Sequence, residues 1–227
     1  ITDDFLEAVK HGKDWDLVDP HDKTVRNTLK ARELWQKILE TRFRTGEPYL
    51  HYVDESNRKL PDDLKSRGLK INHTNLCTEI FLPTNKDRTA VCCLSSLNLE
   101  HYEEWKDTNI VADLVTLLDN VLQTFIDNAP DPLYKAKYSA TMERSIGLGA
   151  MGFHTYLQKN LIPFESVAAK SMNSYMFKMI KEKAVAQTLK LGEERGVYID
   201  AIDSKARNSN LLSIAPNANN SIIAGAS

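Results

Sequence analysis

The residues best suited to chemistry are an amide, a thiol and a carboxylate at alternate positions in the stretch Asn75-Leu-Cys-Thr-Glu79. In an extended chain, side chains two residues apart point to the same side, so Asn75, Cys77 and Glu79 would face one space. The carboxylate can take a proton from a hydroxyl, the amide can orient that hydroxyl, and the sulfur can react at the carbon. Taken alone, this spacing more often belongs to a small packed cysteine between solvated neighbours.

A second sulfur follows in the apolar run Ala90-Val-Cys-Cys-Leu94. We predict that residues 76–82 and 90–94 form two extended segments joined by a turn-rich stretch. Adjacent side chains of a strand point to opposite faces, so only one of Cys92 and Cys93 can join Cys77. A buried cysteine in an apolar strand more often serves packing, so this pattern also needs support from elsewhere.

Alternating helices and strands are expected to position these residues. The expected helices cover residues 20–44, 110–125, 138–159 and 165–195, and the expected short strands cover 49–53, 197–200 and 211–215, with a polar loop over 54–70. Strands that alternate with long helices indicate an α/β fold with parallel strands. Because no internal linker is evident, we expect one domain over residues 1–227.

Composition excludes several classes of function. The 227 residues are 42% hydrophobic and 26% charged, with a formal net charge of −2, so a core can form and no basic cluster is available for nucleic acid. No long apolar run and no signal-like start occur, which favours a cytoplasmic protein, in a bacterial cell or a phage-infected host, without a membrane partner. Three cysteines are too few for a disulfide framework, and the six histidines lack zinc-finger spacing, so no metal site is expected.

A turn near the end of the chain is a candidate phosphate site. It lies between a predicted strand and an apolar segment, where a helix start could present backbone amides to an anion. Its residues are Pro216, Asn217, Ala218, Asn219 and Asn220. Without other support, such an Asn-rich turn would be only a loop.

A glycine pattern in Gly147-Leu-Gly-Ala-Met-Gly152 satisfies the dinucleotide-binding motif. The preceding residues, Thr141-Met-Glu-Arg-Ser145, lack the apolar strand that should lead into that turn. We therefore expect these glycines to serve close helix packing, and a nicotinamide-dependent enzyme is the less favoured alternative.

Two of these stretches together resemble a known active site. Asn75-Leu-Cys-Thr-Glu-Ile-Phe-Leu-Pro83, followed by Ala90-Val-Cys-Cys-Leu-Ser-Ser-Leu-Asn-Leu99, is similar to the active-site region of the ribonucleotide reductase catalytic subunit. Further similarity lies in residues 42–53, 144–153 and 207–216, so the resemblance covers nearly the whole chain. It implies part of a ten-stranded α/β barrel with long helices outside, in an enzyme that reduces ribonucleoside diphosphates to deoxyribonucleotides for DNA synthesis.

The resemblance also implies a role for each site residue. Cys77 matches the thiyl radical that abstracts the 3′ hydrogen of the ribonucleotide, a reversible step because S–H and C–H bonds have similar strengths. Glu79 matches the base for the 3′ hydroxyl, and Asn75 the amide that positions it. Cys92 matches one of two thiols that reduce the 2′ position and become a disulfide. Cys93 is not a cysteine in the common pattern, so we expect it to be structural.

The turn over residues 216–220 matches the one that holds the substrate diphosphate. The resemblance is looser there, because Asn217, Asn219 and Asn220 stand where the family usually has Ser or Thr. Backbone donors would survive these changes.

The resemblance places cofactors and partners outside this chain. A small subunit with a di-metal (iron or manganese) centre would supply the radical, and a thioredoxin- or glutaredoxin-type thiol would restore the cysteines. Adenosylcobalamin is the alternative radical source, although Asn-Leu-Cys-Thr-Glu is more like the class I pattern. The second 2′-reducing cysteine lies upstream in the family, and the radical-relay tyrosines and tail cysteines lie beyond Ser227. We therefore expect a fragment that assembles with the remaining segments; an inactive assembly fragment is the alternative.

Overall fold

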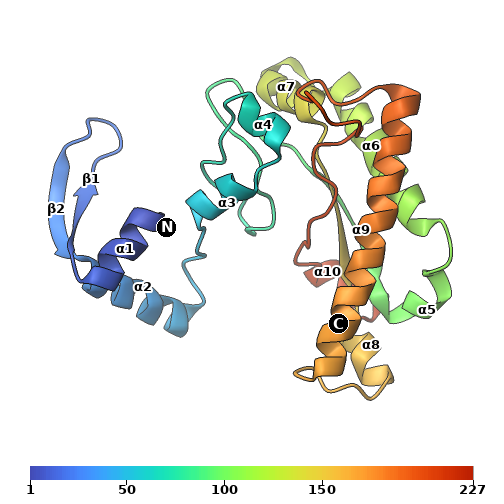
Figure 1. Ribbon diagram of the computed structural model, residues 1–227, viewed down its shortest axis with the longest axis horizontal. Coiled ribbons are helices and arrows are strands. Elements are labelled where there is room, and N and C mark those ends of the chain that lie inside the picture. The colour runs from blue at the N-terminus through green and yellow to red at the C-terminus, as the bar shows by residue number, and fades with distance from the viewer. Residues whose placement is uncertain (227) are drawn as a thin grey trace. The chain divides into compact units, whose positions relative to one another are not determined.

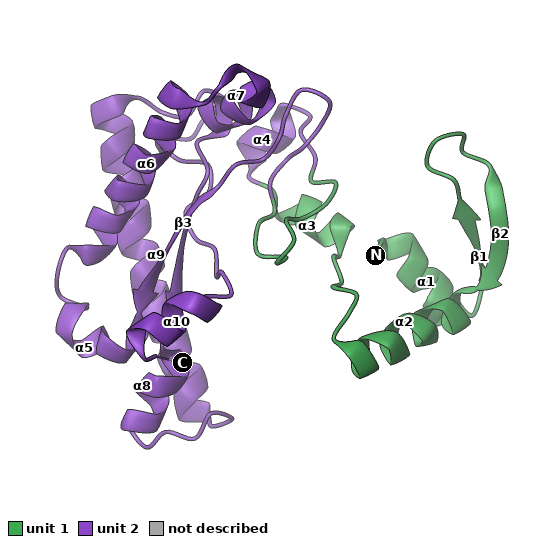
Figure 2. Ribbon diagram, turned by 180° about the vertical axis from the view of Figure 1, so that it is seen from behind, with its two compact units in different colours: residues 1–60, 71–81 green, residues 61–70, 82–227 purple. Residues whose placement is uncertain are grey.

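The computed structural model of the chain describes residues 1–226 and divides into two compact units (Figure 2). Unit 1 comprises Ile1–Leu60 and Ile71–Phe81, and unit 2 comprises Pro61–Lys70 and Leu82–Ser227. The expectation that residues 1–227 act as a single domain segment stays a prediction.

Unit 1 is built from three helices and one hairpin. Its elements are α1 Asp3–His11, β1 Asp14–Val18, β2 Val25–Lys30, α2 Ala31–Thr45 and α3 Val53–Lys59. The side chain of Thr2 caps α1 by accepting a hydrogen bond from the N–H of Phe5. Phe5 is buried with Ala8 and Ala31, so a small core joins α1 to the start of α2.

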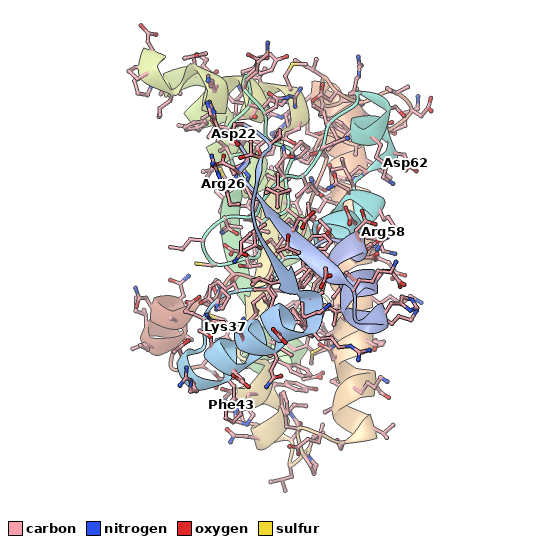
Figure 3. The ribbon with its side chains drawn as sticks, turned by 90° about the vertical axis from the view of Figure 1, so that its left-hand side faces the viewer. Asp22, Arg26, Lys37, Phe43, Arg58 and Asp62 are labelled. Atoms are coloured by element: carbon pink, nitrogen blue, oxygen red, sulfur yellow. The ribbon has the colours of Figure 1, made fainter. Side chains whose placement is uncertain are left out.

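The hairpin occupies the first part of the predicted helix over residues 20–44, which is therefore wrong before Ala31. Its turn is closed by side chains, because Asp19 and Asp22 accept hydrogen bonds from the N–H groups of His21 and Thr24. Arg26 of β2 then pairs with Asp22 at 2.6 Å, and Figure 3 shows the two side chains together at the hairpin. This local polar network favours the turn over helix.

Two further expectations for this part of the chain are wrong. Residues 49–53 do not form a strand; they lead directly into α3. The predicted loop over residues 54–70 contains most of α3 and all of α4, Asp62–Ser66, which belongs to unit 2.

Unit 2 carries long helices beside a small parallel sheet. Besides α4 its elements are β3 Cys93–Asn98, the 3-10 helix η1 Leu99–His101, α5 Tyr102–Trp105, α6 Ile110–Asn128, η2 Asp131–Leu133, α7 Tyr134–Glu143, β4 Ile146–Met151, α8 Phe153–Lys159, α9 Val167–Arg195 and α10 Ala218–Ala224. The helices predicted over residues 110–125 and 165–195 are confirmed by α6 and α9. In Figure 1 these two helices run alongside each other, and α6 contacts both strands.

The sheet of unit 2 is parallel, as the α/β expectation requires. Cys93 of β3 lies opposite Ile146 of β4, and Asn98 lies opposite Met151. Leu212 makes one parallel bridge to Leu148 on the other side of β4. The predicted strand over residues 211–215 is thus reduced to a single bridge, and that over 90–94 begins only at Cys93. Residues 197–200 form no strand.

The glycine-rich stretch after α7 is a strand, which corrects the predicted helix over residues 138–159. Arg144 ends α7 in the left-handed conformation, with φ 46°, and the buried strand β4 follows. A Cβ atom added to Gly147 would lie 2.9 Å from the Cβ of Ser213 and 3.1 Å from the Sγ of Cys92. The absence of a side chain at Gly147 therefore lets Cys92 and Ser213 pack closely against β4. The prediction that these glycines serve close helix packing is wrong.

The main core of unit 2 lies between the sheet and the helices α6 and α9. Its fully buried side chains include Val115 and Leu122 of α6, Ile146 and Leu148 of β4, and Met176 of α9. Each helix within residues 1–226, taken by itself, is too short or too polar to span a membrane. The pair Leu99–Trp105 and Ile110–Asn128 satisfies the length and composition requirements only when taken together, and it is bent by 115°.

A buried ionic cluster ties α6 to the segments around it. The carboxylate of Asp119, 1% exposed, accepts hydrogen bonds from Arg144 at 2.7 Å, Arg195 at 3.1 Å and Asn208 at 3.1 Å. Arg207 approaches the same carboxylate at 3.5 Å. Burial alone would raise the pKa of Asp119, but the hydrogen bond and charge of Arg144, aided by the charge of Arg207, hold it below the ordinary value.

Candidate active site

The Cys77 segment of unit 1 is held at both ends. At its start, the side chain of Asn57 on α3 donates to the carbonyl of Ile71 at 2.8 Å and accepts from the N–H of Ile71 at 2.9 Å. At its end, the ring of Phe81 meets the ring of His51 edge to face, with centroids 5.4 Å apart. The residues between are therefore presented as an anchored loop.

The loop turns at Cys77. The N–H of Thr78 donates to the carbonyl of Asn75 at 3.2 Å, and Thr78 adopts a left-handed φ of 62°. The Oδ1 of Asn75 accepts hydrogen bonds from the N–H groups of Glu79 and Ile80 at 3.1 and 3.0 Å. The extended segment predicted over residues 76–82 is therefore wrong here, because the Asn75 side chain satisfies backbone donors that a strand would pair elsewhere.

This turn changes how the three predicted residues come together. Strand alternation does not apply, and Asn75 and Glu79 are instead joined through the hydrogen bond that the N–H of Glu79 donates to the side-chain Oδ1 of Asn75. Because that oxygen is engaged, the group that Asn75 can offer to a hydroxyl is its amide N–H. Cys77 is an exposed free thiol at the tip, and Glu79 is half-buried. A carboxylate, an amide donor and an accessible thiol thus share one short turn.

Cys92 and Cys93 of unit 2 form no disulfide with the other described residues, and the two thiols face different surroundings. Cys93 packs against the main core, and burial raises the pKa of its thiol. The Sγ of Cys92 lies over Gly147, on the side that also carries the side chain of Leu94. Cys93 is therefore held in the apolar layer, while Cys92 lies on the opposite face of the sheet.

The turn over residues 216–220 is fastened to that same face. The hydroxyl of Ser96 on β3 donates to the Oδ1 of Asn217 at 2.7 Å, while the Nδ2 of Asn217 donates to the carbonyls of Ala150 on β4 and of Ala215. Asn217 itself is left-handed, with φ 55° and ψ 18°. Its side chain therefore fixes the turn near the carboxyl ends of two parallel strands, where α/β proteins commonly bind ligands.

A hollow of about 310 Å³ opens at this turn. Four of the five predicted substrate-binding residues line it, together with residues of β3; the lining consists of Leu94, Ser95, Ser96, Ala215, Asn217, Ala218, Asn219 and Asn220. Pro216 is exposed and is not among the lining residues. Sequence reasoning missed Ser95 and Ser96, and the hydroxyl of Ser96 serves to fix the turn because its proton is donated to Asn217. The signal that could have found them is the pair of hydroxyl side chains directly after the Cys92-Cys93-Leu94 run.

The predicted residues thus fall into two groups. Asn75, Cys77 and Glu79 belong to unit 1, while Cys92 and the 216–220 turn belong to unit 2. The meeting of Cys77 and Cys92 in one pocket stays a prediction. Among residues 1–226, no group of three or more His, Cys, Asp or Glu side chains is placed to hold a metal ion.

Comparison with known proteins gives one consistent family. The family model "Ribonucleotide reductase, barrel domain" matches residues 1–206. A putative ribonucleoside-diphosphate reductase large subunit of Frog virus 3 (isolate Goorha) is 54% identical over 230 residues, which cover 100% of this chain and 41% of the relative. A vitamin B12-dependent ribonucleoside-diphosphate reductase of Thermoplasma acidophilum is 34% identical over 238 residues, which cover 100% of this chain and 30% of the relative.

A solved structure agrees with this result. The Actinobacillus ureae class Id ribonucleotide reductase alpha subunit matches with a TM-score of 0.87 and 37% identity, over 100% of this chain and 41% of that one. The chain therefore spans about two fifths of the length of the first of these relatives.

Proposed function

This chain belongs to the ribonucleotide reductase family, with the α/β fold of its barrel domain, and we propose that it supplies the radical cysteine and one reducing cysteine of a ribonucleoside-diphosphate reductase large subunit. In this proposal the substrate is a ribonucleoside diphosphate and the product is the 2′-deoxyribonucleotide used for DNA synthesis. The site is Asn75, Cys77, Glu79 and Cys92, with the 216–220 turn holding the diphosphate.

Each residue has a defined part in the proposed reaction. The thiyl radical of Cys77 takes the 3′ hydrogen atom of the substrate and returns it at the end. Glu79 accepts the proton of the 3′ hydroxyl, and Asn75 orients that hydroxyl through its amide N–H. Cys92 and a second thiol from another segment together give two electrons and two protons, so that the 2′ hydroxyl leaves as water and the two sulfurs form a disulfide.

The observation that carries this proposal is the shared face of unit 2. Cys92, Ser96 and the Asn217-fixed turn lie on one face of the sheet, and a 310 Å³ hollow, lined by Ser96 and the turn but not by Cys92, opens on that face. The side-chain amides of Asn219 and Asn220 and the backbone N–H groups of the turn are the donors at this hollow that suit the oxygens of a diphosphate. A reducing thiol and an anion site on one face are what the proposed chemistry needs from this part of the chain.

Partners complete the proposed enzyme. We propose that the remaining segments of the large subunit, a radical-generating small subunit with a di-metal centre and an external dithiol protein act with this chain in the cytoplasm of the cell or infected host. Adenosylcobalamin is the alternative radical source, which the B12-dependent relative keeps open.

Reconstitution tests the proposed function. The chain is combined with the remaining large-subunit segments and given either a di-metal small subunit or adenosylcobalamin, together with a ribonucleoside diphosphate and a dithiol reductant. We expect deoxyribonucleotide from the complete mixture with the di-metal subunit and none from the chain alone, because the second reducing thiol is on another segment. Full activity of the isolated chain, or no product from any complete mixture, would contradict the proposal.

The phosphate turn gives a separate prediction for substrate affinity. In the reconstituted enzyme, Asn217→Ala should raise the KM for the diphosphate by about 5- to 30-fold, because it removes the side-chain bonds to Ser96, Ala150 and Ala215 and strains a left-handed backbone. Asn217→Gly is the matched control: it loses the same bonds but adopts this conformation freely, so its KM should rise less. Steady-state kinetics of both variants measure this; an unchanged KM in both would rule out the turn as a binding element.

A further inference from the structure

A second group of buried ionisable residues lies apart from the proposed active-site residues. Arg88, on the segment between the Cys77 loop and β3, pairs with Asp200 at 2.7 Å, and their side chains are 6% and 3% exposed. The guanidinium of Arg88 also lies over the ring of Tyr138 on α7, 5.3 Å from its centre. Glu143, the last residue of α7, is fully buried beside this pair.

The charges of this group do not balance if every member is ionised. Glu143 and Asp200 are two carboxylates, while Arg88 is the single cation among the described residues that acts on Glu143. Within residues 1–226, both carboxylate oxygens of Glu143 and the Nη1 of Arg88 are buried without a hydrogen-bond partner, and the Oδ2 of Asp200 has only its ion pair with Arg88. A second buried anion with neither a cation of its own nor a hydrogen bond is very unfavourable, and adding a proton to one carboxylate removes the imbalance.

The proton belongs on Glu143. Asp200 has the direct ion pair with Arg88, whereas Glu143 has none. Burial raises the pKa of Glu143 to about 8; the charge of Arg88 lowers it in part, and the charge of Asp200 raises it further. The neighbouring Arg144 is turned away, towards Asp119 on α6.

The group also holds together three segments that converge on β3 and β4. The N–H of Thr89 donates to the carbonyl of Lys135 on α7, and the N–H of Asp200 donates to the carbonyl of Met142. Arg88 lies four residues before Cys92, and Glu143 lies three residues before β4. The residues that lead to Cys92 are thus fastened to the end of α7 through this buried group.

We propose that Glu143 is a positioning residue that carries a proton at neutral pH and, with Arg88 and Asp200, holds residues 82–92 in place ahead of Cys92. Loss of the proton leaves an uncompensated buried charge, which is relieved when this segment opens to water. The consequence for Cys92 as a reducing thiol rests on the proposed function; the proton and the opening do not.

The sign of the pH dependence follows from the raised pKa. The stabilisation that protonated Glu143 gives to the closed segment is complete below the ordinary pKa of 4.5. This stabilisation is lost as the pH rises through about 8. The pKa of Glu143 is about 8 in the closed segment and returns to 4.5 when the segment opens to water. The equilibrium constant for opening should therefore rise about 30-fold between pH 6.5 and pH 9.

Hydrogen–deuterium exchange of the full large subunit tests this proposal. Protection factors, corrected for the intrinsic effect of pH, are measured for peptides covering residues 82–92 at pH 6.5 and pH 9. We expect protection in this segment to fall about 30-fold, while α6 peptides keep theirs. Glu143→Gln, which stays neutral, should show the same protection at both pH values. Glu194→Gln, at an exposed position on α9, is the matched control and should behave like the wild type.

The wild-type result alone decides the matter if Glu143→Gln does not fold. Equal corrected protection of residues 82–92 at both pH values would overturn the proposal, as would a fall of similar size in α6. In a folded Glu143→Gln protein, a pH-dependent loss equal to that of the wild type would also overturn it. Because none of these measurements uses turnover, the result stands whether or not the chain acts as a reductase.

Discussion

Cys77→Ser is expected to abolish turnover of the reconstituted enzyme, by at least about 10³-fold, while leaving its assembly intact. A serine O–H bond is much stronger than the S–H bond, so the side chain cannot serve as a reversible hydrogen-atom carrier. Cys77 is exposed at the tip of an anchored turn, and replacing its sulfur by oxygen disturbs no core packing. Product formation and size-exclusion chromatography of the variant complex measure the two effects separately.

Cys93→Ser is the matched control for this substitution. Cys93 packs against the main core, so the new hydroxyl should cost about 1 kcal/mol of stability, with turnover similar to that of the wild type. Unchanged turnover in Cys77→Ser would instead support the alternative that this chain is an inactive assembly fragment. Loss of turnover in Cys93→Ser alone would show that the roles of the cysteines are misplaced.

Asp119→Ala should have the largest effect on stability, a loss of about 3–5 kcal/mol. The substitution removes the one carboxylate that Arg144, Arg195 and Arg207 share, and it leaves buried guanidinium groups without compensation. It also breaks the bond from Asn208, which links the segment after α9 to α6. Urea-induced unfolding, followed by circular dichroism, measures the shift.

Asp127→Ala provides the comparison on the same helix. Asp127 is exposed near the end of α6 and bonds only to Gln123 among the described residues, so its removal should change stability by no more than about 0.5 kcal/mol. Equal unfolding midpoints for the two variants would mean that the arginine cluster contributes little.

The long helices could be predicted because their patterns are local. In α6, apolar residues recur with helical spacing from Ile110 to Phe125, and Pro130 follows its end; α9 has Ser166 and Gly196 at its two ends. Such signals do not depend on distant partners. The same is true of the parallel α/β class, which follows from the alternation of elements.

The strand β4 could not be predicted because its partners are distant in the sequence. Gly147 and Gly149 have low strand propensity, and only pairing with β3 and approach of Ser213 make an extended conformation favourable. The hairpin of unit 1 was also missed from the sequence, for a related reason. Its strands are mostly exposed, so they carry no alternation of apolar and polar residues to signal them.

The chemical identity of the site was easier to predict than its geometry. Asn75, Cys77 and Glu79 were found through side-chain types at alternate positions, yet the structure joins them through a turn that Asn75 closes. The signal for that turn was present, because Asn side chains commonly bond to backbone N–H groups two or more residues ahead. The tie between Ser96 and Asn217 spans residues far apart in the sequence, and no local pattern indicates it.

A single-turnover experiment tests the central claim most directly. The reconstituted enzyme, with its tail cysteines replaced by serine so that they cannot reduce the active-site disulfide, is fully reduced and freed of external reductant. It is then given substrate and a radical source and alkylated for mass spectrometry of each cysteine peptide. The account predicts that Cys92 is found in a disulfide in an amount equal to the deoxyribonucleotide formed, while Cys77 and Cys93 stay free thiols. Product formed while Cys92 remains fully alkylatable, or with Cys93 oxidised in its place, would contradict it.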